Sequence, residues 1–179
     1  IPNVSVARYL TRTLLRSIGR SLSVNKVFND LKSQGRRVSK TTLYDYIGHF
    51  EDAFLSFAVP LHDRSPRRAE TAPKKIYAVD PGLAAAFMPA AEQDLGQRFE
   101  NLVYLDLRRR GCDVTYYLTR DRYEVDFVAH HPSGRDELVQ ACYDPSDEAT
   151  LARETRALDE ASKELGIPGT IVTPQTYLE

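Results

Sequence analysis

The chain has 179 residues, of which 42% are hydrophobic and 27% are charged, a composition typical of a folded globular protein. No apolar run approaches the roughly 18 residues that span a bilayer, and no stretch resembles a cleaved signal peptide, so we expect no membrane association. The two cysteines, Cys112 and Cys142, form neither a CxxC motif nor a disulfide framework, which indicates a reducing, cytoplasmic setting.

The formal net charge of −1 conceals an uneven distribution. Residues 1–75 hold 14 of the 24 Lys and Arg but only 6 of the 25 Asp and Glu, so residues 76–179 are acidic. We therefore expect two units with different partners, a basic one for nucleic acid and an acidic one for a cation or a basic protein surface. The alternative is that the basic helices are simply solvated.

Helical periodicity fills the first third of the chain. A first helix is expected over residues 6–19. Ser23 and Ser39 are suited to cap two more helices, over residues 24–35 and 40–54. Two capped helices joined by a short glycine-containing turn are typical of a helix-turn-helix.

A β-hairpin is expected next, with strands over residues 55–61 and 74–79 and a basic, proline-containing loop over residues 63–73. A hairpin after a helix-turn-helix predicts a winged helix domain over residues 1–80. DNA contacts are expected from the start of the second helix of the motif and from the wing. The candidate residues are Lys40, Thr41, Thr42, Tyr44, Arg64, Arg67 and Arg68. The alternative is a winged helix that serves as a protein–protein adaptor.

The acidic half, residues 81–179, predicts an α/β domain with a mixed sheet flanked by helices. Three strands come in succession between two longer helices, and a last strand follows the second of these helices. Helices are expected over residues 82–88, 92–110 and 147–165, and strands over residues 112–119, 123–129, 136–143 and 169–173.

Acidic and polar side chains mark the second and third of these strands. Alternation along a strand places Glu124 with Asp126 on one face, and Gln140 with Cys142 on one face. If the strands pair as a hairpin, the polar faces meet, and the helix that carries Glu100 covers one end. Converging carboxylates bind Mg²⁺, which activates water near a phosphate. The alternative is an acidic pair that faces solvent on a half-exposed sheet.

A family resemblance rests on GQRFENLVYLDL (96–107), YEVDFV (123–128) and LVQACYD (138–144), in this order and spacing. The pattern resembles the nuclease-like C-terminal domain of many prokaryotic AAA-type ATPases, which has no assigned function and is similar to the PD-(D/E)XK, restriction-endonuclease-like fold. The winged helix and KKIYAVDPGL (74–83) match the same architecture, so the resemblance covers nearly the whole chain.

The resemblance implies that Glu100 and Asp126 are the metal-binding carboxylates of the fold. The Glu-x-Lys strand of the family falls on Gln140-Ala141-Cys142. Gln140 keeps one neutral oxygen for a metal, but Cys142 cannot replace the lysine, and loss of one preorganised charge costs about 10²–10³ in rate. We therefore expect a degenerate catalytic site, with Mg²⁺ binding still open. Arg153 on the next helix is a candidate for a replacement cation.

No G-x-x-x-x-G-K-[ST] phosphate loop occurs in the chain, so ATP is not expected to bind to it. The resemblance implies an ATPase module elsewhere in the full-length protein. The leading hypothesis is a DNA-binding effector or regulatory region of an AAA-type ATPase, with nuclease chemistry lost or weakened. The alternatives are an active Mg²⁺-dependent DNA endonuclease and a protein-interaction module.

Overall fold

The computed structural model describes residues 3–88 and 94–178. They form two compact units. The first unit is Ile1–Val59 with Ala72–Gln93, and the second unit is Pro60–Thr71 with Asp94–Glu179. Within the described residues, every helix is too short or too polar to traverse a bilayer.

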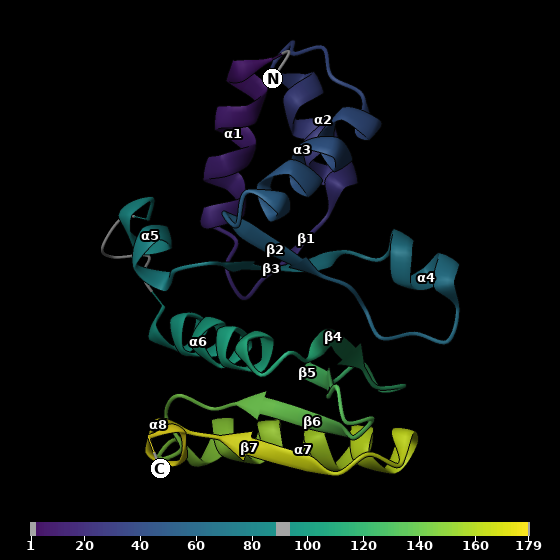
Figure 1. Ribbon diagram of the computed structural model, residues 1–179, viewed down its shortest axis with the longest axis vertical. Coiled ribbons are helices and arrows are strands. Elements are labelled where there is room, and N and C mark those ends of the chain that lie inside the picture. Colours follow the sequence, from purple (N-terminus) through teal and green to yellow (C-terminus); the bar gives the residue numbers. More distant parts are fainter. Residues whose placement is uncertain (1–2, 89–93, 179) are drawn as a thin grey trace. The chain divides into compact units, whose positions relative to one another are not determined.

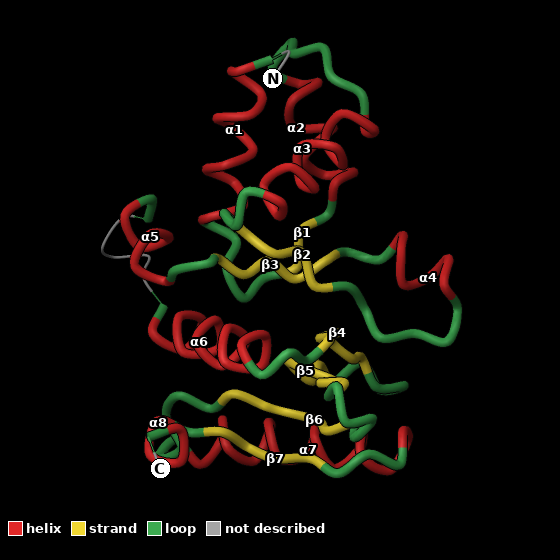
Figure 2. The backbone as a smooth tube through the Cα atoms, in the orientation of Figure 1, coloured by secondary structure: helices red, strands yellow, loops and turns green. Residues whose placement is uncertain are grey.

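The first unit combines helices with a small antiparallel sheet of order β1-β3-β2 (Figures 1 and 2). The three helices and two strands expected here are confirmed, and the two-residue strand β1 was not predicted. The elements are α1 (Val4–Leu15), β1 (Ser21–Leu22), α2 (Val24–Ser33), α3 (Lys40–Asp52), β2 (Ser56–Val59), β3 (Lys74–Ala78) and α5 (Pro81–Ala86).

Buried aliphatic side chains from the helices and the sheet form the core of the first unit. Leu10, Leu31, Leu43 and Ile76 are fully buried in one cluster. Each helix begins at a side-chain cap, and on α3 the Ser39 Oγ accepts the backbone N–H of the third residue that follows it (3.0 Å). Caps and apolar stripes together thus explain why these segments are helical.

The chain between β2 and β3 corrects the sequence-based prediction of a basic loop. It contains the helix α4 (Pro66–Thr71), on which Arg67 and Arg68 lie. Proline is favoured at the first helical position, and the Ser65 Oγ accepts the backbone N–H of Arg68 (3.4 Å). The whole segment Pro60–Thr71 belongs to the second unit.

Backbone hydrogen bonds anchor this segment to the second unit. The His62 N–H donates to the Tyr116 carbonyl (2.6 Å), and the Tyr116 N–H donates to the Pro60 carbonyl (3.0 Å). Leu61 forms a parallel bridge with Tyr116. Helix α5 belongs to the first unit, and the expected domain boundary after residue 80 stays a prediction.

The second unit contains a four-stranded mixed sheet of order β4-β5-β6-β7 (Figure 1). Only the β6–β7 pair is parallel, so the prediction of a mixed sheet is confirmed. The elements are α6 (Leu95–Arg109), β4 (Asp113–Leu118), β5 (Glu124–His130), β6 (Asp136–Ala141), α7 (Glu148–Leu165), β7 (Gly169–Val172) and α8 (Pro174–Tyr177).

Helices α6 and α7 cover opposite faces of this sheet. The Tyr104 ring of α6 lies 6.1 Å from the Phe127 ring of β5, measured between centroids. Leu158 of α7 packs instead in a cluster with Val128 and Leu138. Because successive residues of a strand point to opposite faces, contacts to Phe127 and to Val128 come from different sides. The sheet is therefore flanked by helices, as the sequence predicted.

Candidate functional site

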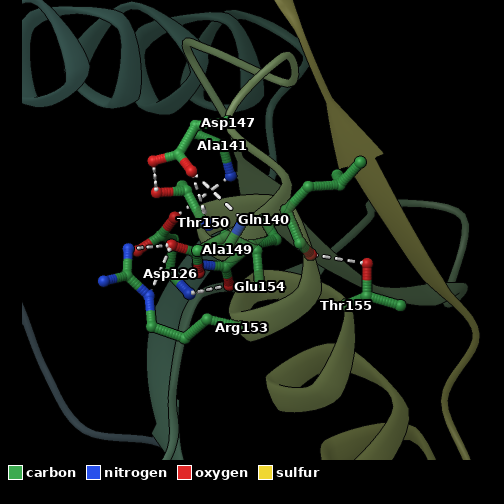
Figure 3. Close-up of polar contacts among 10 residues, drawn as sticks. Asp126, Gln140, Ala141, Asp147, Ala149, Thr150, Arg153, Glu154 and Thr155 are labelled. Atoms are coloured by element: carbon green, nitrogen blue, oxygen red, sulfur yellow. Dashed lines mark hydrogen bonds and ion pairs between the residues drawn. The ribbon is translucent and has the colours of Figure 1, made fainter.

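The candidate site lies where the backbone ladder between β5 and β6 ends. The paired register runs to Phe127 opposite Val139. Beyond that pair the Asp126 N–H donates to the Gln140 Oε1 (3.0 Å), and the Ala141 N–H donates to the Asp126 Oδ2 (3.0 Å) (Figure 3). Side-chain atoms thus take the place of backbone partners, so that buried N–H groups stay satisfied.

Asp126 and Gln140 are both buried, at 7% and 4% exposure. An acidic pair on a half-exposed sheet was the alternative interpretation, and it does not hold for Asp126. The other polar atom of Gln140, Nε2, donates to the Glu154 Oε2 on α7 (2.6 Å). The N–H of Asp126 needs an acceptor and the carboxylate of Glu154 needs a donor, which fixes the orientation of the amide. The Gln140 oxygen is therefore engaged with the backbone.

Glu154 connects this pair to a cation. The Nε of Arg153 donates to the Glu154 Oε1 (3.2 Å), and Nη2 forms an ion pair with the same oxygen. This hydrogen bond and the Glu154 charge raise the pKa of Arg153, and the charges of Asp147 and Asp126 add to the effect. The Glu154 side chain is 12% exposed against 66% for Arg153. The cation thus lies at the rim of the site.

Glu154 was not predicted from the sequence. Its only local signal is its place on the helical stripe that includes Ala157, the buried residue three positions later. A stripe shows that a helix faces the sheet, but not which strand it meets. Tertiary packing of α7 decides that Glu154 meets Gln140.

A cavity of about 620 Å³ joins these residues, and we call it the site cavity. One face of α6, the adjoining ends of β5 and β6, and one face of α7 line it. The four candidate catalytic residues share this cavity, although their roles stay a prediction. They are Glu100, Asp126, Gln140 and Cys142.

Cys142 contributes a neutral group to the site cavity. Its side chain is 1% exposed, and burial raises the pKa of its thiol, with the charges of Glu154 and Asp144 raising it further. A thiol with a raised pKa stays protonated near neutral pH. Cys142 therefore supplies neither the charge nor the hydrogen bonding of a lysine.

Several carboxylate oxygens of the site cavity are engaged within the protein, and Mg²⁺ binding stays a prediction. Mg²⁺ requires several oxygen ligands in octahedral geometry, yet both oxygens of Glu154 and one oxygen of Asp126 accept hydrogen bonds within the protein. Across residues 3–88 and 94–178, no group of three or more His, Cys, Asp or Glu side chains is placed to hold a metal.

The expected DNA-contacting residues divide between the two units. On α3 of the first unit, Lys40, Thr41 and Tyr44 are exposed, and Thr42 is half-buried beside the cap. The exposed fraction of Tyr44 is 47%. The three arginines of the expected wing are also exposed, but they belong to the second unit.

Comparison with known proteins places the chain in a family. A family model matches residues 1–94, more than half of the chain. The chain belongs to this family, the domain of unknown function DUF8612. No solved structure matches the chain.

Two longer proteins are similar to this member of the DUF8612 family. One is the uncharacterised protein MJ1544 of Methanocaldococcus jannaschii, 31% identical over 180 residues, which are 99% of this chain and 39% of that protein. The other is an uncharacterised protein of Haemophilus influenzae, 28% identical over 116 residues, or 65% of this chain and 29% of that protein. The chain thus spans less than half of the length of either relative. Neither has an assigned activity, and the nuclease and ATPase resemblance stays a prediction.

Proposed function

We propose that the chain is the DNA-binding effector region of a larger AAA-type ATPase, with a PD-(D/E)XK-like site whose chemistry is lost or weakened. The length of the relatives supports a larger protein, because more than half of each lies outside the matching region. The mixed sheet with helices on both faces supports the nuclease-like part of the proposal.

The exposed start of α3 carries the proposal of DNA binding. The order α1-β1-α2-α3-β2-α4-β3 and the sheet order β1-β3-β2 support the winged-helix part of the proposal. In such a domain the N-terminal part of the second helix of the motif enters the major groove. Here that part presents Lys40, Thr41 and Tyr44 to solvent. The excess of Lys and Arg in residues 1–75 supports contact with phosphates.

DNA binding by a variant of α3 tests this proposal. We expect Lys40→Gln/Thr41→Val to bind a fluorescent DNA duplex on the order of 10-fold more weakly than the wild type at low salt, because a phosphate or base contact is lost. The matched control is Lys163→Gln/Thr170→Val, which changes two exposed residues of the second unit. Equal affinity of both variants would remove α3 from the interface, and no binding by the wild type would contradict the proposal itself.

The bonding of the site cavity supports the loss of chemistry. Gln140 uses both ends of its amide to hold Asp126 and Glu154, so its oxygen is already engaged within the protein. Arg153, the candidate replacement cation, is paired with Glu154. These bonds support a site in which no other side chain compensates for Gln140 and Cys142.

An active Mg²⁺-dependent endonuclease is the second candidate function. One observation favours it: the carboxylates of Glu100, Asp126 and Glu154 are among six that line a single cavity together with Arg153. The test is incubation of the protein with plasmid and branched DNA in Mg²⁺ or Mn²⁺. We expect no cleavage above background. Cleavage that Asp126→Asn abolishes would establish this second function instead.

A further inference from the structure

A second polar cavity, of about 580 Å³, lies in the second unit beside the site cavity. It is bounded by the segment Pro60–Thr71, by the end of β4 with the turn that follows, and by the C-terminal end of α7. We call it the arginine cavity. The charged residues that line it are Asp63, Arg64, Arg68, Arg120, Arg122 and Glu164, and the Tyr117 hydroxyl lies beside them.

The carboxylates of the arginine cavity already have partners. Glu164 accepts hydrogen bonds from the Tyr117 hydroxyl (2.6 Å) and from the Arg120 backbone N–H (3.1 Å). Asp63 pairs with the Arg68 guanidinium (3.2 Å). The hydrogen bond from the Tyr117 hydroxyl lowers the pKa of Glu164. Burial and this same bond raise the pKa of Tyr117 to about 12. Tyr117 therefore stays a neutral donor and adds no negative charge to the cavity.

Three arginine side chains remain available. Among the residues that the structure describes, no hydrogen bond or ion pair engages the guanidinium groups of Arg64, Arg120 and Arg122, and all three residues are exposed. With Arg68 they give the cavity four positive charges against two negative ones. Like charges held together in a cavity repel one another, and a bound anion relieves that repulsion.

Arg122 connects the two cavities, because it lines both. It lies in the turn between β4 and β5 with a φ of 66°, a left-handed conformation that few residues other than glycine adopt. Two backbone bonds of 2.9 Å hold the turn: the Arg122 N–H donates to the Thr119 carbonyl, and the Thr119 N–H donates to the Tyr123 carbonyl. The position of Arg122 between the cavities is thus built into the fold.

Four arginines around one cavity fit a polyanion better than a single small anion. A guanidinium binds phosphate oxygens through two parallel hydrogen bonds. A DNA backbone presents such groups at regular intervals.

We propose that the arginine cavity binds backbone phosphates of DNA and that Arg122 leads the strand toward the site cavity. This inference rests on the proposed function, since it names where DNA contacts the nuclease-like unit. The segment Pro60–Thr71 then contributes to DNA binding through Arg64 as part of the second unit.

The test compares two double variants of the full chain. Arg64→Gln/Arg120→Gln removes two partnerless charges from the arginine cavity, while Arg109→Gln/Lys163→Gln removes two exposed charges from outside both cavities. Binding of a fluorescent DNA duplex is measured across a salt series. Each phosphate contact contributes about 0.9 to the slope of log affinity against log salt. The cavity variant should therefore lose about 1.8 from this slope, and the control should keep the wild-type slope.

A charge-preserving variant and an RNA duplex complete the test. Arg64→Lys/Arg120→Lys keeps the charge and should keep most of the slope, which separates phosphate binding from a defect in folding. Equal slopes for the cavity variant and the control, with DNA still bound, would overturn this inference and leave the proposed function standing. Absence of binding by the wild type would overturn both. Tighter binding of an RNA duplex of the same sequence would overturn the choice of DNA.

Discussion

At the scale of single residues, Gln140 joins three elements. It accepts a hydrogen bond from the backbone of β5, donates one to Glu154 of α7, and belongs to β6. Side-chain alternation along the strands predicted that Asp126 and Gln140 meet. It could not predict that an amide, with one donor end and one acceptor end, suits a site between a backbone N–H and a carboxylate. This fit gives Gln140 a structural role.

Replacement of Gln140 should therefore destabilise the fold. We expect Gln140→Leu to lower the free energy of unfolding by about 2–4 kcal/mol, because it leaves the buried Asp126 N–H without an acceptor and the Oε2 of the largely buried Glu154 without its donor. Chemical denaturation measures the loss. The control Gln175→Leu changes an exposed glutamine of α8 and should have little effect. A similar stability for both variants would show that the bonds of Gln140 are dispensable.

At the scale of elements, the segment Pro60–Thr71 contains a titratable contact. The His62 Nδ1 lies 3.3 Å from the Thr115 Oγ1, and its ring lies 5.4 Å from that of His130. Burial and then repulsion from His130 lower the pKa of His62, while Asp136 and Asp63 oppose the shift. The anchored segment consequently favours a neutral imidazole.

Acidification should loosen this segment. The pKa of His62 is lower in the folded state than its unfolded value of 6.5. The neutral imidazole therefore contributes stability fully at a pH above 6.5, and this contribution is lost as the pH falls through the folded-state pKa. We expect the His62 and Tyr116 amides, corrected for intrinsic rates, to exchange faster at pH 5.5 than at pH 7.5. His62→Gln should abolish this difference, whereas the control His49→Gln should preserve it. An unchanged pH dependence in His62→Gln would assign the effect to another group.

The elements also show what local sequence can predict. Long periodic stretches with caps, such as the helix that begins after Ser39, were placed correctly because their signals lie within the element. Helix α4 was missed although Ser65-Pro66 is a helix start signal, because basic and proline residues favoured a loop. Strand β1 was missed because a two-residue strand is defined by its partner β3. Glu154 was missed for the same reason, since α7 meets the sheet through contacts that are distant in sequence.

At the scale of the whole molecule, we propose that each of the two units provides a surface for DNA. The first unit presents the start of α3, and the second presents the arginine cavity beside the site cavity. The uneven charge of the sequence predicted a division of roles. It did not predict that Arg64, Arg67 and Arg68 belong with the acidic unit, because only the fold assigns Pro60–Thr71 to it. Both units are therefore expected to contact DNA.

Hydrogen exchange of the full chain with and without a DNA duplex tests this expectation most directly. Bound DNA shields backbone amides where it contacts the protein and lowers local opening. The predicted result is DNA-dependent protection of residues 39–44 and of residues 118–123, with no change on the exposed face of α7. Bound DNA without protection of residues 39–44 would contradict binding through α3, and a chain whose exchange DNA does not alter at all would contradict the proposed function.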